Sequence, residues 1–146
     1  MTADRLTGLR RVYPDAVAYS ASFNLVEFGA EAARALLAGS DGQTPKPADE
    51  RPTAILAQSD LLAVGVLQVA EELGLAVPAD LSVAGFDGVR IDGLAAHDLT
   101  TMRQPAAAKG RAAGLAVTRM LAGEMAESVQ FTCELHLGDT TGPVPA

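Results

Sequence analysis

Apolar residues recur along the chain with two periods, one typical of strands and the other typical of helices. Short runs that are continuously apolar, or that alternate apolar with polar residues, predict β-strands, because successive strand side chains point to opposite faces. These runs cover residues 17–22, 53–58, 81–86, 99–103 and 129–137. The run 53–58 is apolar at consecutive positions, which predicts a strand buried on both faces of a parallel sheet.

Apolar residues spaced three and four apart predict helices between these strands. The predicted helices cover residues 2–13, 24–39, 61–73 and 106–122. Asn24 and Glu27 have the spacing of a capping box at the start of the second helix, and Asp60 precedes the third helix as its cap. Helices that alternate with strands predict an α/β domain with a mainly parallel sheet.

Residues 40–52 interrupt this pattern. They contain Pro, Gly, Asp, Lys, Gln and Glu and no large apolar residue, so they cannot bury surface. We expect an exposed, mobile loop that proteases cleave readily.

Composition and charge narrow the possible partners. A chain of 146 residues is long enough for one ordinary domain with its own core. Its net charge of -7 repels nucleic acid. The single cysteine, Cys133, excludes an internal disulfide and fits a reducing cytosol. No apolar run has the length of a membrane helix, and the first residues lack the apolar segment of a signal peptide. We therefore expect a cytoplasmic protein without a membrane partner.

The sequence carries no motif of an enzyme or a metal site. It has no G-x-S-x-G, no P-loop and no G-x-G-x-x-G, and neither histidine stands in a zinc-binding motif. We therefore expect no catalytic residue, no metal and no cofactor. An α/β enzyme whose catalytic groups are scattered along the sequence is the alternative.

Three segments together resemble the LacI-type (lactose-repressor) family of bacterial transcription regulators. They are PTAILAQSDLLAVG at 52–65, GLAVPADLSVAGFD at 74–87, and LTTMRQP at 99–105, which is followed by a helix with Gly110. Their order and spacing match the C-terminal half of the family, and RLTG at 5–8 and NLVEFG at 24–29 fit the same register. The resemblance spans residues 3–142.

The resemblance implies an incomplete type I periplasmic-binding-protein-like fold, an α/β three-layer sandwich around a mainly parallel sheet. Residues 1–104 would form the C-terminal effector-binding subdomain. Residues 105–146 would form a crossover helix and a tail strand that pack, in relatives, on an N-terminal subdomain absent here. The helix-turn-helix is absent as well, so we expect an effector-sensing portion that contacts DNA only through a domain outside this chain. A soluble sugar-binding protein and a nonfunctional repressor fragment are the alternatives.

The resemblance also implies a binding site for a small effector, by default a sugar, at the C-terminal ends of the strands. The implied ligand-binding residues are Arg5, Asn24, Ser59, Phe86, Asp87 and Gln104. A guanidinium donates to hydroxyl pairs, and an ionised carboxylate accepts from two adjacent hydroxyls. Each residue also has a structural alternative: a surface position for Arg5, a helix cap for Asn24, the core for Phe86, a turn for Asp87 and a hinge for Gln104. Ser59 stands where many relatives carry Asn.

The helix at 61–73 is apolar nearly all round, although a helix on a sheet needs only one apolar stripe. The surplus face predicts burial against a second copy of the chain. The resemblance implies a homodimer interface there, with contacts at Val64, Leu67, Ile91 and Ala95.

The helix at 106–122 carries a second unpartnered stripe, formed by Ala113, Val117, Met120 and Leu121. We expect this helix to exchange or dock between chains.

Overall fold

The computed structural model describes residues 2–89 and 97–144. Within these residues the chain forms four helices and four strands. In chain order they are α1 (Thr2–Val12), α2 (Val26–Leu37), β1 (Ala54–Leu56), α3 (Asp60–Glu72), β2 (Ser82–Asp87), β3 (Thr100–Arg103), α4 (Ala106–Leu121) and β4 (Glu134–His136). The four predicted helices are confirmed, with shifts of a few residues at their ends.

The strands form one sheet in the order β1-β2-β3-β4. β1, β2 and β3 run parallel, and β4 is antiparallel to β3. The predicted mainly parallel sheet is therefore confirmed. The carboxyl ends of the three parallel strands meet at one edge, the place where open α/β sheets bind ligands.

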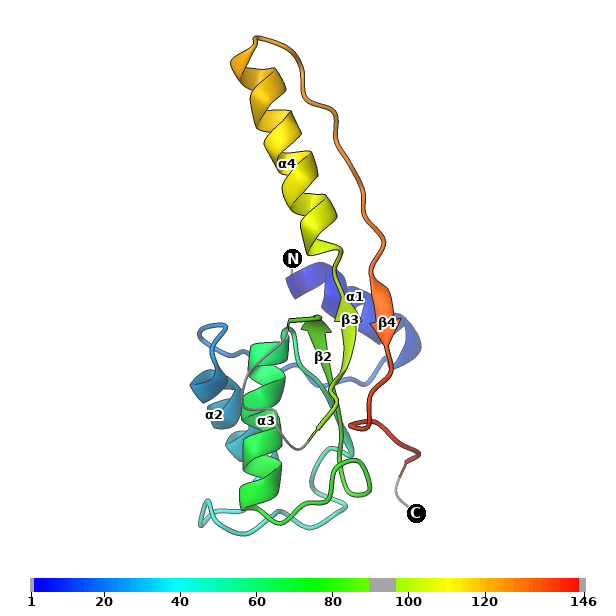
Figure 1. Cartoon of the computed structure of the whole chain (residues 1–146). Helices are drawn as coiled ribbons and strands as arrows, with labels where there is room; N and C mark the ends of the chain where they lie inside the picture. Colours follow the sequence, from blue (N-terminus) through cyan, green and yellow to red (C-terminus); the bar gives the residue numbers. More distant parts are fainter. Residues whose placement is uncertain (1, 90–96, 145–146) are drawn as a thin grey trace.

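The two faces of the sheet are covered unequally (Figure 1). α2 and α3 pack on one face, and Leu37, Leu81 and Val83 are completely buried there. α1 lies on the other side of the sheet, near the carboxyl edge. Leu56 is 45% exposed on this side, so the prediction that residues 53–58 are buried on both faces is wrong. The reason is that β1 is an edge strand and α1 covers only part of its outer face.

α2 and α3 approach each other closely at two glycines. A Cβ atom added at Gly65 would lie 2.1 Å from the carbonyl oxygen of Val26, and one at Gly29 would lie 2.3 Å from that of Leu62. α2 therefore covers part of the second apolar face of α3 within the same chain.

This packing corrects the argument for a dimer through α3. Val64 and Leu67 are only 5% and 6% exposed, so they are buried within the chain rather than presented to a partner. Ile91 and Ala95 lie outside the described residues. The homodimer itself stays a prediction.

Two predicted strands are wrong or too long. Residues 17–22 form no strand in the structure, and Val17 is 86% exposed. Of residues 129–137, only Glu134–His136 form a strand, because β3 ends at Arg103 and leaves the preceding residues without a partner. An alternating sequence makes a strand only where another strand offers a free edge.

The predicted helix caps are also corrected. α2 begins at Val26 with Leu25 as its N-cap and without a side-chain cap, so Asn24 does not cap it. The N-cap of α3 is Ser59, whose Oγ accepts a hydrogen bond from the amide of Leu62 at 3.2 Å. Asp60 lies one residue further along and makes other contacts.

Residues 40–52 lie at the surface and contain no helix or strand. Part of this loop is tied back, because the amide of Lys46 donates to the carbonyl oxygen of Leu37 at 2.7 Å. Its mobility stays a prediction.

α4 extends away from the sheet, and the chain returns beside it toward β4 (Figure 1). None of the residues of α4, all of which are described, is buried. The division of the chain at residue 104 stays a prediction. In the described part of the chain no helix combines the length and apolar character needed to cross a membrane.

Candidate functional site

Polar side chains gather where the three parallel strands end. Ser59 follows β1 after a short link, Asp87 is the last residue of β2, and Gln104 follows β3 directly. The parallel order brings these residues to one edge although 45 positions separate the first from the last in the sequence.

Asp87 and Gln104 form the most connected pair at this edge. The Gln104 Nε2 donates to Asp87 Oδ1, and the Gln104 backbone amide donates to the Asp87 carbonyl oxygen at 3.0 Å. Lys109 Nζ donates to Gln104 Oε1, so the amide of Gln104 is held from both ends. Sequence reasoning missed Lys109, which lies in the exposed first turn of α4.

The turn after β2 explains the position of Asp87. Asp87 and Gly88 have φ angles of 116° and 72°, and a Cβ at Gly88 would lie 2.7 Å from the Cα of Arg103. The predicted Asp-Gly turn is therefore present. It coexists with the contact to Gln104 and leaves Asp87 half-buried at the edge.

Arg5 and Phe86 form a second pair. The guanidinium carbon of Arg5 lies 3.5 Å from the centroid of the Phe86 ring, a cation–π contact. Arg5 Nη1 also donates to the carbonyl oxygen of Gln58 at 2.6 Å, which fixes the guanidinium at the end of β1. Arg5 is thus directed toward the sheet edge rather than toward solvent alone.

Asn24 and Ser59 form a third pair. Ser59 Oγ donates to Asn24 Oδ1 and also caps α3, and Ser59 is only 3% exposed. Asn24 is exposed, so its remaining hydrogen-bonding groups face outward. The six predicted residues thus form three contacting pairs at one end of the domain.

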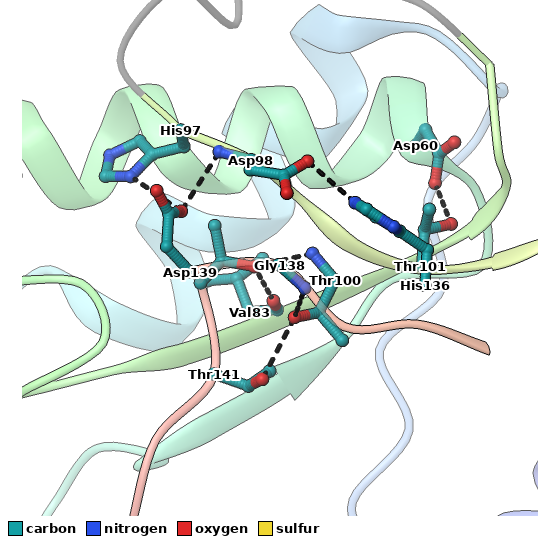
Figure 2. Close-up of polar contacts among 11 residues, drawn as sticks. Asp60, Val83, His97, Asp98, Thr100, Thr101, His136, Gly138, Asp139 and Thr141 are labelled. Carbon is teal, nitrogen blue, oxygen red and sulfur yellow. Dashed lines mark hydrogen bonds and ion pairs between the residues drawn. The ribbon is translucent and has the colours of Figure 1, made fainter.

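Asp60 supports this edge from beneath. It is 1% exposed, and its carboxylate accepts from Thr101 Oγ1 at 2.6 Å (Figure 2) and from the amide of Val89 at 2.8 Å. Asp60 therefore links α3 to β3 and to the turn that carries Asp87. Its place in the first turn of α3 also favours a negative charge.

A separate cluster joins the amino end of β3 to the segment after β4 (Figure 2). His136 Nε2 lies 2.7 Å from Asp98 Oδ1, and His97 Nδ1 lies 3.7 Å from Asp139 Oδ1. The sequence analysis did not pair these residues. Among residues 2–89 and 97–144 no group of three or more His, Cys, Asp or Glu side chains is arranged to hold a metal ion.

The chemistry of the carboxyl edge is that of a binding site. Arg5, Gln104 and Lys109 supply hydrogen-bond donors, and Asp87 and Asn24 supply acceptors. Such a mixture complements hydroxyl groups, which both donate and accept.

The chain resembles known proteins over most of its length. Residues 6–141 match the periplasmic binding protein-like domain. The HTH-type transcriptional repressor CytR of Escherichia coli (strain K12) is 35% identical over 121 residues, which cover 82% of this chain and 33% of CytR.

Solved structures agree with this similarity. The crystal structure of a LacI transcriptional regulator from Rhodococcus species is 31% identical with a TM-score of 0.71, covering 84% of this chain and 42% of that one. A LacI family transcriptional regulator from Arthrobacter sp. FB24, in complex with lactose, is 31% identical with a TM-score of 0.61, covering 81% of this chain and 42% of that one. The chain thus spans less than half the length of the relatives it matches. It belongs to the periplasmic binding protein-like family, in the form that makes up the effector-binding region of LacI-type transcriptional regulators.

Proposed function

We propose that this chain senses a sugar effector for a LacI-type transcriptional regulator. The observation that carries the proposal is the gathering of Asp87–Gln104, Arg5–Phe86 and Asn24–Ser59 at the carboxyl edge of the parallel strands. Ligands bind at that edge in open α/β sheets. The similar Arthrobacter regulator, which holds lactose, supports a sugar as the effector.

The hydrogen-bonding capacity of the edge fits a polyhydroxylated ligand. Asp87 Oδ1 is engaged by Gln104, which leaves its second oxygen to accept from ligand hydroxyls. The guanidinium of Arg5 uses one of its nitrogens on Gln58 and keeps further N–H groups for ligand oxygens. These contacts bind a sugar and perform no chemistry on it, so we propose no catalytic role for the chain.

The proposal extends to the partners of the whole regulator. The relatives are transcriptional regulators, so we propose that the chain works in the cytoplasm, as a homodimer, and acts on DNA through a helix-turn-helix domain outside this sequence. The acidic chain itself, with a net charge of -7, should not bind operator DNA.

Nuclear magnetic resonance titration with glucose and lactose tests the proposal. The titration uses both the 146-residue chain and the longest natural gene product that contains it. We expect shifts at Ser59, Asp87 and Gln104, with weak affinity in the shorter chain, which spans 42% of a similar regulator.

Two alanine variants complete the test. Asp87→Ala should abolish the shifts, and Asp49→Ala, in the exposed loop, should leave them unchanged. Shifts that survive Asp87→Ala, or the absence of sugar binding in both proteins, would reject the proposed site.

A further inference from the structure

A groove lies between α1 and the outer face of the sheet, next to the three residue pairs. Leu9, Leu56, Phe86 and Met102 give it largely apolar walls, and Arg5 lies at its side. It encloses about 210 Å³. This is less than the roughly 300–1,000 Å³ of pockets that hold drug-sized ligands, so it is suited to a single ring.

Gln58 gives this groove an unusual polar atom. Its Oε1 is buried and lacks a hydrogen-bond partner, the one such side-chain atom within residues 2–89 and 97–144. The backbone of Gln58 is satisfied separately, because its carbonyl oxygen accepts from Arg5 Nη1 at 2.6 Å. A buried acceptor without a donor destabilises a folded chain, so its presence calls for a donor supplied from outside the protein.

We infer that Gln58 is a further effector-binding residue, whose Oε1 accepts a hydrogen bond from one hydroxyl of a sugar ring seated in the groove. The inference rests on the proposed function and deepens it. A pyranose has a C–H face that suits the apolar walls at Leu56 and Met102, and a rim of hydroxyl donors that suits a lone acceptor. Arg5, held between Gln58 and Phe86, joins this groove to the rest of the site.

The inference makes stability and binding respond in opposite directions. Gln58→Leu keeps a side chain of similar length and removes the unpaired acceptor, so the ligand-free protein should keep or gain stability. The same change should weaken sugar binding by about tenfold, the value of one hydrogen bond in a buried site. A purely structural glutamine would lose stability on this substitution. Gln68→Leu, at an exposed position of α3, is the matched control and should leave binding unchanged.

The experiment measures the affinities of glucose and of its monodeoxy analogues by NMR titration on the longest natural gene product that contains this sequence. For wild-type protein, removal of one particular hydroxyl should weaken binding by about tenfold. In Gln58→Leu the same deoxy sugar should bind as well as glucose does, because the interaction is already lost. Thermal unfolding of the ligand-free proteins completes the comparison.

Different failures are distinguishable. If glucose binds and Asp87→Ala weakens it while Gln58→Leu does not, the inference about Gln58 is wrong and the proposed function stands. The same holds if Gln58→Leu lowers stability without changing affinity, since a bound water then satisfies Oε1. If no sugar binds to the wild-type protein, the sugar-sensing function fails and this inference fails with it.

Discussion

Replacing Gly65 with alanine tests the packing of α2 on α3, which forms the helical layer of the domain. The added Cβ would lie 2.1 Å from the carbonyl oxygen of Val26 and 2.4 Å from the amide nitrogen of Ala30. Both are backbone atoms of α2 or of its first turn, so they cannot rotate away as a flexible side chain could. The two helices must separate to admit the methyl group.

The magnitude follows from two opposing effects. Alanine is favoured over glycine inside a helix by about 1 kcal/mol. Overpacking a closely packed interface costs typically about 1–3 kcal/mol, and contacts this short with backbone belong at the upper end. Separation of the helices also loosens the packing around Ala33 and Val69, which are fully buried. We expect Gly65→Ala to lower the free energy of unfolding by about 2 kcal/mol.

Gly110→Ala in α4 is the matched control. A Cβ at Gly110 would meet nothing within 4 Å, so alanine should stabilise the chain or leave it unchanged, with at most about 1 kcal/mol gained from helix propensity. Urea unfolding followed by circular dichroism measures both variants. The packing argument fails if Gly65→Ala is as stable as wild type. A destabilising Gly110→Ala would instead show that another molecule covers α4 in solution.

Three further predictions concern separate parts of the chain. Thr101→Val should lower the free energy of unfolding in urea by about 1–3 kcal/mol, because Asp60 keeps its buried charge and loses a donor, whereas Thr101→Ser should retain most of the stability. The backbone amide of Thr44 is the main cause that lowers the pKa of Asp41 below 3.8, so the turn should be most stable above that pH and lose this contribution as pH falls through the lowered pKa; a carboxyl NMR titration with a midpoint at or above 3.8 would contradict this. Leu121→Lys, at a position 84% exposed, should reduce self-association in sedimentation equilibrium, and a wild-type chain that is monomeric at all concentrations would oppose docking through α4.

The sequence was a good guide wherever an element carries its own stabilising contacts. β2 holds Val83 in the core and lies between two other strands, so its apolar run and its structure agree. Residues 17–22 have a comparable alternating pattern, yet Tyr19 is 51% exposed and no strand forms. A strand depends on a partner that is remote in sequence, and no local pattern reports whether that partner has a free edge.

The candidate site shows the same limit at the level of side chains. Resemblance to a family placed six residues at the correct edge of the sheet. It did not predict the contact of Asp60 with Thr101, which are 41 positions apart, and Asp60 was expected to act as a cap. A polar residue at the start of a helix either caps it or reaches a neighbouring element, and the local sequence is the same in both cases. Gln58 was missed because its distinguishing feature, an unpaired buried oxygen, exists only in the folded chain.

α4 separates the formation of a helix from its burial. Alanine and leucine favour the helical backbone locally, so the sequence was sufficient to predict it. Leu115, Met120 and Leu121 are nevertheless between 64% and 84% exposed, because the chain offers them no surface. At about 25 cal/mol per Å² of apolar surface, covering such side chains would contribute several kcal/mol, which is comparable with the stability of a small domain. The chain spans 42% of the similar Rhodococcus regulator, so the surface that covers α4 belongs either to the rest of a longer polypeptide or to a second copy. A charge at Leu121 separates these cases, since it weakens self-association only in the second.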